Sequence, residues 1–382
     1  MRTDEAPLLV FWETTRACEL ACRHCRAAAN PNPAAGELTT WEGVRLIEQL
    51  AAFRPRPPVL VLTGGDVMMR PDVLELVWMG RRARLPVALA PSVTPRLSRA
   101  ALVELKRLGV TNISISLDGA SARTHEGIRG IPGHFERTLD ALRELATLGF
   151  TTQVNTAVMR DNVEELADVA GIVRDVGATC WEVFHLVKVG RGRAVGELSA
   201  EENEDVAHFL FEAARYGFIV RTVEAPWFRR VAAWRRTTEP TADPTREFAL
   251  GPLYRRLSAR LLERLGPPTD RPWAGTAGTR DGKGILFVSH AGWVYPAGFL
   301  PLPLGNVRDE SPVDIYLHHP LLLAIRRAEF SGRCGVCEFR DLCGGSRARA
   351  FAASEDALGE DPGCAYVPGS RWRSAAAGDT GR

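Results

Sequence analysis

Three cysteines lie close together near the start of the chain and could bind iron. They are Cys18, Cys22 and Cys25, and their spacing is CxxxCxxC. Three thiolates on one short loop can bind three irons of a [4Fe–4S] cluster and leave the fourth iron without a protein ligand. Such an open position can bind a small molecule, as in catalytic zinc sites. The next cysteine, Cys180, is far along the chain. The spacing therefore favours a catalytic cluster over one that only carries electrons.

Zinc is the alternative for this loop. A structural zinc site needs a fourth ligand, and His24 between two of the cysteines is the local candidate. Adjacent residues do not easily surround one tetrahedral ion, so the spacing favours the cluster.

A second group of cysteines lies near the end of the chain. Cys334, Cys337 and Cys343 form the pattern CxxC-x5-C, and Cys364 follows twenty-one residues later. Four cysteines can complete a cluster or bind zinc. The eighth cysteine, Cys180, belongs to neither group, and we expect it to be a small buried apolar residue.

The elements that must position these residues alternate along the first part of the chain. Short apolar runs rich in β-branched residues predict strands at 8–13, 59–63, 87–90, 113–117, 151–158 and 180–187. Amphipathic stretches predict helices at 40–53, 71–82, 98–108, 135–148, 163–176 and 200–215. The alternation predicts parallel βα units with right-handed crossovers, which form a curved sheet with helices outside. Chemistry in such folds lies at the carboxyl ends of the strands, and the first three cysteines directly follow the first strand.

The rest of the chain is organised differently. Residues 224–280 are rich in Arg, Pro and Trp and contain one good helix candidate at 252–265. They form either a segment that covers the substrate or a mobile linker. A hairpin pattern begins near residue 284, and the second cysteine group follows it. We therefore expect three parts, at residues 1–223, 224–280 and 281–382.

A glycine-rich turn ends the second predicted strand. Gly64 and Gly65 allow a tight turn close to a ligand, and Asp66 could accept a hydrogen bond from an ammonium group. The triplet alone is a weak signal, because most such triplets are plain turns.

The combination of CxxxCxxC with Gly-Gly-Asp one βα unit later resembles the radical S-adenosylmethionine (SAM) enzymes. The resemblance implies a partial (β/α)6 TIM-like barrel, followed here by a small C-terminal iron–sulfur domain with a β-hairpin. It implies that Gly64, Gly65 and Asp66 hold the methionine amino group, although the family motif usually ends in Glu. Ser116 and Arg129 match residues that bind SAM in the peptide-maturase and haem-biosynthesis branch. Asn155, at the end of the fifth strand, is a further candidate contact, with strand-end capping as its alternative.

The second cysteine group resembles the SPASM or twitch region of the same enzymes. There, CxxC-x5-C and a late cysteine complete one auxiliary [4Fe–4S] cluster with no open iron. Larger versions carry extra cysteines, and the matching neighbourhoods here, 295–298 and 344–347, contain none. The resemblance therefore implies two clusters, one catalytic and one auxiliary.

Arginines near the predicted barrel mouth could bind substrate carboxylates. Arg191 and Arg193 lie on a glycine-containing loop after the sixth strand, and Arg347 lies beside the second cysteine group. A solvated loop is the alternative for such a run.

Composition excludes some partners. The net charge of +2 predicts no bulk attraction to nucleic acid. No apolar run approaches the ~18 residues of a membrane span, and the acidic N-terminus does not resemble a signal peptide. We expect a cytoplasmic enzyme.

The resemblance also implies a reaction. An external one-electron reductant such as flavodoxin or ferredoxin reduces the catalytic cluster, SAM is cleaved to a 5'-deoxyadenosyl radical, and the radical abstracts hydrogen from substrate. The motifs are most similar to the alternative haem (tetrapyrrole) biosynthesis branch, which implies oxidative modification or decarboxylation of a carboxylated tetrapyrrole. The alternatives are a peptide maturase, a sugar or aminocyclitol dehydrogenase, and a non-enzymatic iron–sulfur or zinc protein.

Overall fold

A parallel sheet forms the centre of the computed structural model, which describes residues 3–237, 243–268, 271–274 and 278–370. The six predicted strands are all present and pair side by side in chain order. A seventh parallel strand, which the sequence analysis did not predict, continues the sheet. The strands are β1 (Leu9–Glu13), β2 (Val59–Thr63), β3 (Val87–Leu89), β4 (Asn112–Ser116), β5 (Thr151–Val158), β6 (Cys180–His185) and β7 (Ile219–Val223).

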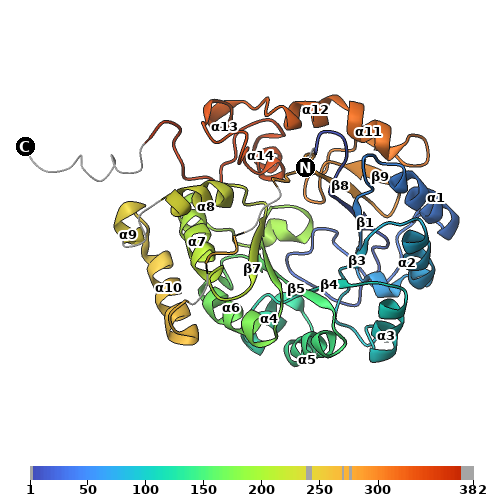
Figure 1. Cartoon of the computed structure of the whole chain (residues 1–382), viewed down its shortest axis with the longest axis horizontal. Helices are drawn as coiled ribbons and strands as arrows, with labels where there is room; N and C mark the ends of the chain where they lie inside the picture. The colour runs from blue at the N-terminus through green and yellow to red at the C-terminus, as the bar shows by residue number, and fades with distance from the viewer. Residues whose placement is uncertain (1–2, 238–242, 269–270, 275–277, 371–382) are drawn as a thin grey trace, which may run out of the picture.

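Helices connect these strands and lie outside them (Figure 1). Several begin at a Ser or Thr whose side chain accepts a hydrogen bond from the first turn, as Thr39, Ser98 and Ser199 do. The connecting helices are α1 (Thr40–Ala51), α2 (Val73–Arg82), α3 (Arg99–Arg107), α4 (Ala122–Arg129), α5 (His134–Thr147), α6 (Leu166–Asp175) and α7 (Ala200–Ala213). This arrangement confirms the predicted barrel-type α/β fold.

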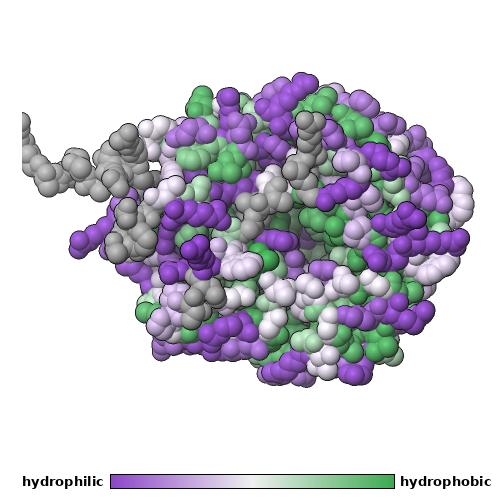
Figure 2. Space-filling model, in the orientation of Figure 1, coloured by the Kyte–Doolittle hydropathy of each residue, from purple (hydrophilic) through white to green (hydrophobic). Residues whose placement is uncertain are grey.

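The two faces of the sheet differ because side chains alternate along a strand. Residues such as Trp12, Leu60 and Trp181 are fully buried against the helices. The fit there is close: a Cβ added at Gly43 of α1 would lie 2.6 Å from the Trp12 ring. The residues between them face the concave side of the barrel, where the space-filling view shows a hollow near the centre of the molecule (Figure 2).

The C-terminal part of the chain extends the same sheet. The predicted hairpin is present, and its first strand pairs in parallel with β1, so the full order is β10-β9-β8-β1-β2-β3-β4-β5-β6-β7. The added strands are β8 (Ile285–Val288), β9 (Trp293–Tyr295) and β10 (Gly305–Asn306). The C-terminal helices lie between the two ends of the arc of barrel helices (Figure 1). They are α11 (Pro312–His318), α12 (Pro320–Arg326), α13 (Gly332–Val336) and α14 (Arg347–Ser354).

The predicted covering segment is largely helical. It contains α8 (Trp227–Thr237), α9 (Pro244–Glu247) and α10 (Pro252–Leu265), and α10 packs against α6 and α7 on the outside of the barrel. The division at residues 223 and 280 stays a prediction, and parts of 224–280 and 281–382 lie outside the described residues. Short 3-10 turns complete the fold at η1 (Val67–Met69), η2 (Val163–Glu165) and η3 (Gly190–Ala194). In the described ranges no helix is long and apolar enough to cross a membrane.

Candidate active site at the strand ends of the barrel

The first cysteine group lies on the loop between β1 and α1. The backbone N–H of Cys18 donates to the carbonyl of Asn30 across 2.8 Å, which brings the two arms of the loop together. Backbone N–H groups also point at two of the sulfurs: Leu20 donates to Sγ of Cys18 at 3.4 Å and Ala29 to Sγ of Cys25 at 3.5 Å. Donors aimed at sulfur stabilise a thiolate and tune a bound cluster. The predicted ligands therefore sit in surroundings that suit iron–sulfur ligation.

Burial makes a free thiolate costly on this loop. It raises the pKa of the Cys18 and Cys22 thiols above the usual range, although Arg129 opposes the rise at Cys22. A bound metal reverses this balance, because it keeps coordinating thiols deprotonated. The loop thus suits a metal-bound state better than free thiolates.

Arg191 holds the cysteine loop in place. Its Nε donates to the carbonyl of Cys22 and its Nη1 to the carbonyl of Ala29, both at 2.8 Å. The backbone N–H of Arg191 donates to the carbonyl of Cys25 at 3.0 Å. The sequence predicted a substrate contact for Arg191, but the structure gives its side chain partners on the cysteine loop. Arg193, its predicted companion, is exposed on η3.

The glycine-rich turn after β2 lies directly against the same loop. The N–H of Gly65 donates to the carbonyl of Thr15 at 2.8 Å, and that of Asp66 donates to the carbonyl of Ala17 at 2.7 Å. A Cβ at Gly64 would lie 2.4 Å from the Thr15 carbonyl, and one at Gly65 would lie 2.3 Å from the Ala17 carbonyl. Only glycine permits so close an approach. The two motifs are therefore brought together, as the strand-end rule predicts.

The carboxylate of Asp66 has partners inside the protein. It is fully buried, and it accepts hydrogen bonds from Thr94 Oγ1 at 2.9 Å, Met68 N at 3.1 Å and Ser92 N at 3.3 Å. Its side chain thus fixes the loop after β3 to the turn after β2. The Asp66 carboxylate therefore already has three donors within the protein, and its predicted contact with the methionine amino group stays a prediction.

Arg129 ends α4 beside a cluster cysteine. Its Nη1 donates to Sγ of Cys22 at 3.6 Å, and its Nη2 lies 2.7 Å from Oδ2 of Asp118. Its Nε is buried and has no hydrogen-bond partner in the part of the chain that the structure describes. An unmade bond of a buried donor is costly, and a carboxylate is the usual partner of a guanidinium. The geometry is compatible with the predicted contact to the SAM carboxylate, which stays a prediction.

Asp118 is a residue that the sequence analysis did not assign. It follows β4 by two residues, is fully buried and accepts a hydrogen bond from the N–H of Ala157 at 2.8 Å. Burial alone would raise the pKa of Asp118, but Arg129 and then His24 hold it below its usual range. Asp118 therefore orients Arg129 as an ionised carboxylate. Its position just beyond a strand end was the signal that could have identified it.

His24 also lies against the carboxylate of Asp118. Its Nε2 lies 3.5 Å from Oδ2 of Asp118, and burial lowers the pKa of His24 to about 4, so the ring is neutral near pH 7. Across the described ranges, no three His, Cys, Asp or Glu side chains are grouped to hold a single metal ion. An iron–sulfur cluster has a different requirement, because each cysteine binds a different iron.

Ser116 and Asn155 are direct neighbours on the concave face of the sheet. The register of β4 and β5 places them opposite each other, and both are partly exposed. Oδ1 of Asn155 accepts a hydrogen bond from Gln153 at 2.8 Å. Both predicted SAM contacts therefore lie on one wall of the barrel interior.

The second cysteine group begins on α13 with Cys334, continues with two cysteines before α14 and ends with Cys364 after it. Backbone N–H groups of Phe339 and Gly345 donate to Sγ of Cys337 at 3.4 Å and of Cys343 at 3.5 Å. Gly345 has a φ of +64°, and a Cβ there would lie 2.9 Å from Sγ of Cys334. Electrostatic interactions connect Cys334 with Cys337 and Cys343 with Cys364. The predicted ligands thus lie as two neighbouring pairs, and their binding of one common cluster stays a prediction.

Arg230 provides positive charge beside this group. Burial raises the pKa of Cys343 to about 11 and of Cys364 to about 12, and Arg230 opposes both shifts. Glu204 fixes Arg230 through two hydrogen bonds of 2.8 and 2.6 Å. A buried cation near the sulfurs compensates the charge of thiolate ligands.

Arg347 lies inside the C-terminal part and not at its surface. It is fully buried, and its Nη1 donates to the carbonyls of Ala357 at 3.1 Å and Gly359 at 2.6 Å, while its Nη2 donates to Sγ of Cys334 at 3.6 Å. The sequence predicted a substrate contact here. The structure instead places Arg347 as a support of the second cysteine group.

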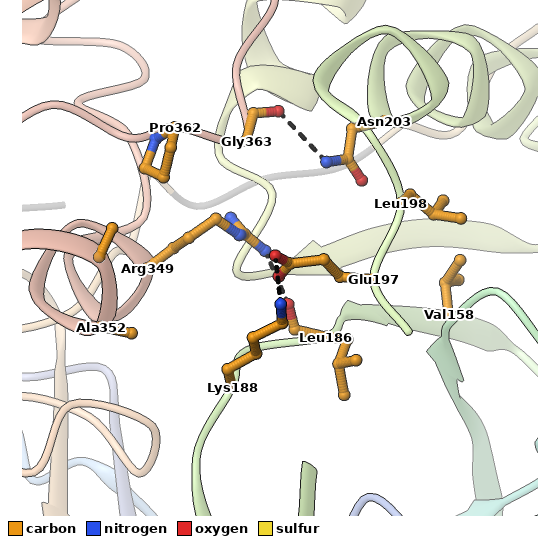
Figure 3. Close-up of a pocket in the computed structure, with 11 residues that line it drawn as sticks. Val158, Leu186, Lys188, Glu197, Leu198, Asn203, Arg349, Ala352, Pro362 and Gly363 are labelled. Atoms are coloured by element: carbon orange, nitrogen blue, oxygen red, sulfur yellow. Dashed lines mark hydrogen bonds and ion pairs between the residues drawn. The ribbon is translucent and has the colours of Figure 1, made fainter. Parts of the chain in front are cut away.

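A pocket of about 300 Å³ lies between the segment after β6 and α14 (Figure 3). Leu186 and Lys188 line it, whereas Val187 between them packs into an apolar cluster with Leu300 and Ala348. Lys188 forms an ion pair with Glu197 at 3.1 Å across the pocket. The lining includes none of the predicted SAM contacts.

Sequence comparison identifies relatives of the whole chain. The model of the radical SAM superfamily matches residues 12–172. The AdoMet-dependent heme synthase of Methanosarcina barkeri is 35% identical over 368 residues, covering 96% of this chain and 98% of that protein. The pre-heme d1 synthase of Dinoroseobacter shibae is 27% identical over 361 residues, covering 93% and 85%.

Comparison with solved structures identifies proteins of the same fold. The crystal structure of Streptococcus suis SuiB bound to the precursor peptide SuiA has a TM-score of 0.68 and 12% sequence identity. The match covers 95% of this chain and 76% of that one. At this identity the likeness concerns the fold alone.

Proposed function

Because the chain belongs to the radical SAM superfamily, we propose that it is an enzyme that oxidatively modifies or decarboxylates a carboxylated tetrapyrrole. The observation that carries the substrate class is the 35% identity to a heme synthase over nearly the full length of both proteins. If the similarity were limited to the barrel, which the whole superfamily shares, it would support hydrogen abstraction but would not indicate a particular substrate.

Cys18, Cys22 and Cys25 would hold the catalytic [4Fe–4S] cluster. When bound, this cluster and SAM supply the hydrogen abstraction that is typical of the superfamily. The backbone of Gly64 and Gly65 would receive the methionine amino group, and Arg129 would receive its carboxylate. The donor set fits, because the sulfurs of Cys18 and Cys25 accept backbone hydrogen bonds and the Nε of Arg129 is buried without a partner among the described residues.

The second cysteine group would hold an auxiliary [4Fe–4S] cluster. Four cysteines leave no open position, and buried Arg230 and Arg347 compensate thiolate charge there. The reaction needs an electron acceptor: a propionate arm that loses one hydrogen atom and CO₂ becomes a vinyl group and leaves one electron. We assign this electron to the auxiliary cluster and the initial reduction to an external donor such as flavodoxin or ferredoxin.

The proposal is tested with anaerobically reconstituted enzyme, SAM, dithionite and a porphyrin with propionate side chains. The expected products are 5'-deoxyadenosine and a modified porphyrin. The molecular mass of this porphyrin, compared with that of the neutral acid, should be lower by CO₂ and two hydrogens for each converted arm. Liquid chromatography and mass spectrometry detect both. Formation of 5'-deoxyadenosine with unchanged porphyrins of this class would reject the tetrapyrrole substrate and retain the radical SAM chemistry.

A further inference from the structure

A row of four polar residues crosses the inner wall of the barrel. The strand registers pair Ser116 of β4 with Asn155 of β5, Asn155 with Glu182 of β6, and Glu182 with Arg221 of β7. Residues paired in register lie on the same face of a sheet. The row therefore continues from the two predicted SAM contacts to a carboxyl group and a guanidinium that have no assigned role.

Neighbouring residues fix which face this row occupies. Trp181 and Val220 are fully buried and lie opposite each other in register. The Trp181 ring packs edge-on against Phe209 of α7 at 6.5 Å, so this pair faces the helices. Glu182 and Arg221, one residue further along each strand, must face the barrel interior.

Arg221 has donors that no other residue in the described part of the chain uses. Its side chain is exposed, and within the described ranges it has no ion pair or side-chain hydrogen bond. Its cross-strand neighbour Glu182 is held instead by Nε2 of Gln153 at 2.9 Å. Burial raises the pKa of Glu182, although Arg221 opposes the rise, so Glu182 cancels less of the guanidinium charge than an exposed carboxylate would.

The arginines that the sequence predicted as substrate contacts are placed differently. Arg191 donates to the cysteine loop, and Arg347 is buried and donates to backbone carbonyls and to Sγ of Cys334. Arg193 lies on η3, beyond the end of β6 and not on a strand of the barrel wall. Of these four arginines, Arg221 is the one that combines a place on the inner wall with unused donors.

The spacing of the strands places Arg221 within reach of a substrate that reacts at the SAM site. Neighbouring strands lie about 4.8 Å apart. Arg221 is two strands from Asn155, so their backbones are separated by about 10 Å. A short carboxylate arm bound at Arg221 would therefore extend toward the predicted SAM contacts.

We propose that Arg221, the cross-strand neighbour of Glu182, binds a carboxylate of the substrate inside the barrel. The inference rests on the proposed function, because the tetrapyrrole supplies the carboxylate. A planar guanidinium suits this role, since it can donate two parallel hydrogen bonds to one carboxylate.

The test measures binding of coproporphyrin III and of its methyl ester to the reconstituted enzyme by absorbance titration. Arg221→Gln is expected to weaken binding of the acid about tenfold or more and to leave binding of the ester unchanged. Arg221→Lys should retain part of the affinity for the acid. Arg107→Gln, on the exposed surface of α3, is the matched control and should bind both compounds as the wild type does.

Three outcomes distinguish a failure of the Arg221 inference from a failure of the proposed function. Selective loss of acid binding in Arg221→Gln supports the inference, and the unchanged ester binding shows that the variant is folded. Equal acid binding by wild type and Arg221→Gln overturns the inference and leaves the proposed function intact. Failure of the wild type to bind either porphyrin overturns both proposals.

Discussion

At the residue scale, the site depends on how buried charges are compensated. Cys22, Arg129 and Asp118 form a chain of contacts in which each group faces an opposite charge when the thiol is ionised. Each of these buried charges would destabilise the fold if the opposite charge beside it were absent. The cysteine loop and the carboxyl end of β4 must therefore be positioned together.

Replacing one catalytic ligand should remove one cluster only. Cys22→Ala is expected to lower the iron content after reconstitution from about eight to about four per chain, because the second cysteine group is untouched. Iron and sulfide analysis measures the change, and formation of 5'-deoxyadenosine should cease. Cys180→Ala, a buried cysteine outside both groups, is the control and should retain about eight irons. An unchanged iron content in Cys22→Ala would contradict the ligand assignment.

His185 should make the folded state sensitive to acid. Burial lowers the pKa of His185 to about 3, against 6.5 in the unfolded chain. Below pH 6.5 the unfolded chain binds the extra proton, so stability falls as the pH falls toward the folded pKa. When the pH is lowered from about 7.5 to 5.5, this group should lower the free energy of unfolding by about 1 kcal/mol.

The measurement compares urea unfolding of the wild type and His185→Gln at both pH values. The glutamine cannot titrate but can still hydrogen-bond Asn203, the partner of His185 at 2.9 Å. The variant should show the smaller loss of stability on acidification. Identical losses in both proteins would show that His185 does not contribute.

At the element scale, the segment after β6 and the cysteine loop contact each other closely at a glycine. The loop after β6 approaches the cysteine loop at Gly190, which has a φ of +53°. A Cβ there would lie 2.2 Å from the carbonyl of Arg26 and 2.6 Å from that of Cys25. The absence of a side chain lets Arg191 reach the cysteine loop.

Gly190→Ala should therefore loosen the catalytic cluster. We expect a lower iron content after reconstitution and faster bleaching of the cluster absorbance in air. Gly177→Ala is the matched control, because Gly177 also has a positive φ, +67°, but has free space around its Cβ position. Equal bleaching rates in the two variants would show that backbone strain alone, and not the contact with the cysteine loop, matters.

At the scale of the whole molecule, the C-terminal part is joined to the barrel at the cysteine loop. Glu13 at the end of β1 accepts hydrogen bonds from Nη2 of Arg26 and from Nδ1 of His290, both at 2.8 Å. Burial would raise the pKa of Glu13, but Arg26 and His290 lower it to about 2. One ionised carboxylate thus connects the catalytic loop with the turn between β8 and β9.

Removing an auxiliary ligand should separate SAM cleavage from product formation. Cys337→Ala is expected to retain the catalytic cluster and to form 5'-deoxyadenosine, while porphyrin product falls about tenfold or more because the electron acceptor is lost. Both compounds are measured in one reaction by mass spectrometry. Full product formation by a variant that lacks the second cluster would rule out the acceptor role.

The sequence alone determined the order of the first six strands and of six of the helices that connect them, because hydrophobic periodicity depends on local residue spacing. It also identified both cysteine groups and the Gly64–Gly65 turn, since their chemistry is carried by neighbouring residues. It did not identify β7, Asp118 or Arg221, whose roles depend on partners far away in the chain.

Only the tertiary structure decided which arginines have donors available for a substrate carboxylate. Arg191 and Arg347 carry the same side chain as Arg221, yet Arg191 donates to carbonyls of the first cysteine loop, and Arg347 donates to the carbonyls of Ala357 and Gly359 and to Sγ of Cys334. The physical reason is that a guanidinium binds whichever acceptors the fold places around it. Residue type and spacing therefore predicted the chemistry of the two cysteine groups, and the packing of distant segments showed which arginine has donors left for the substrate that we propose.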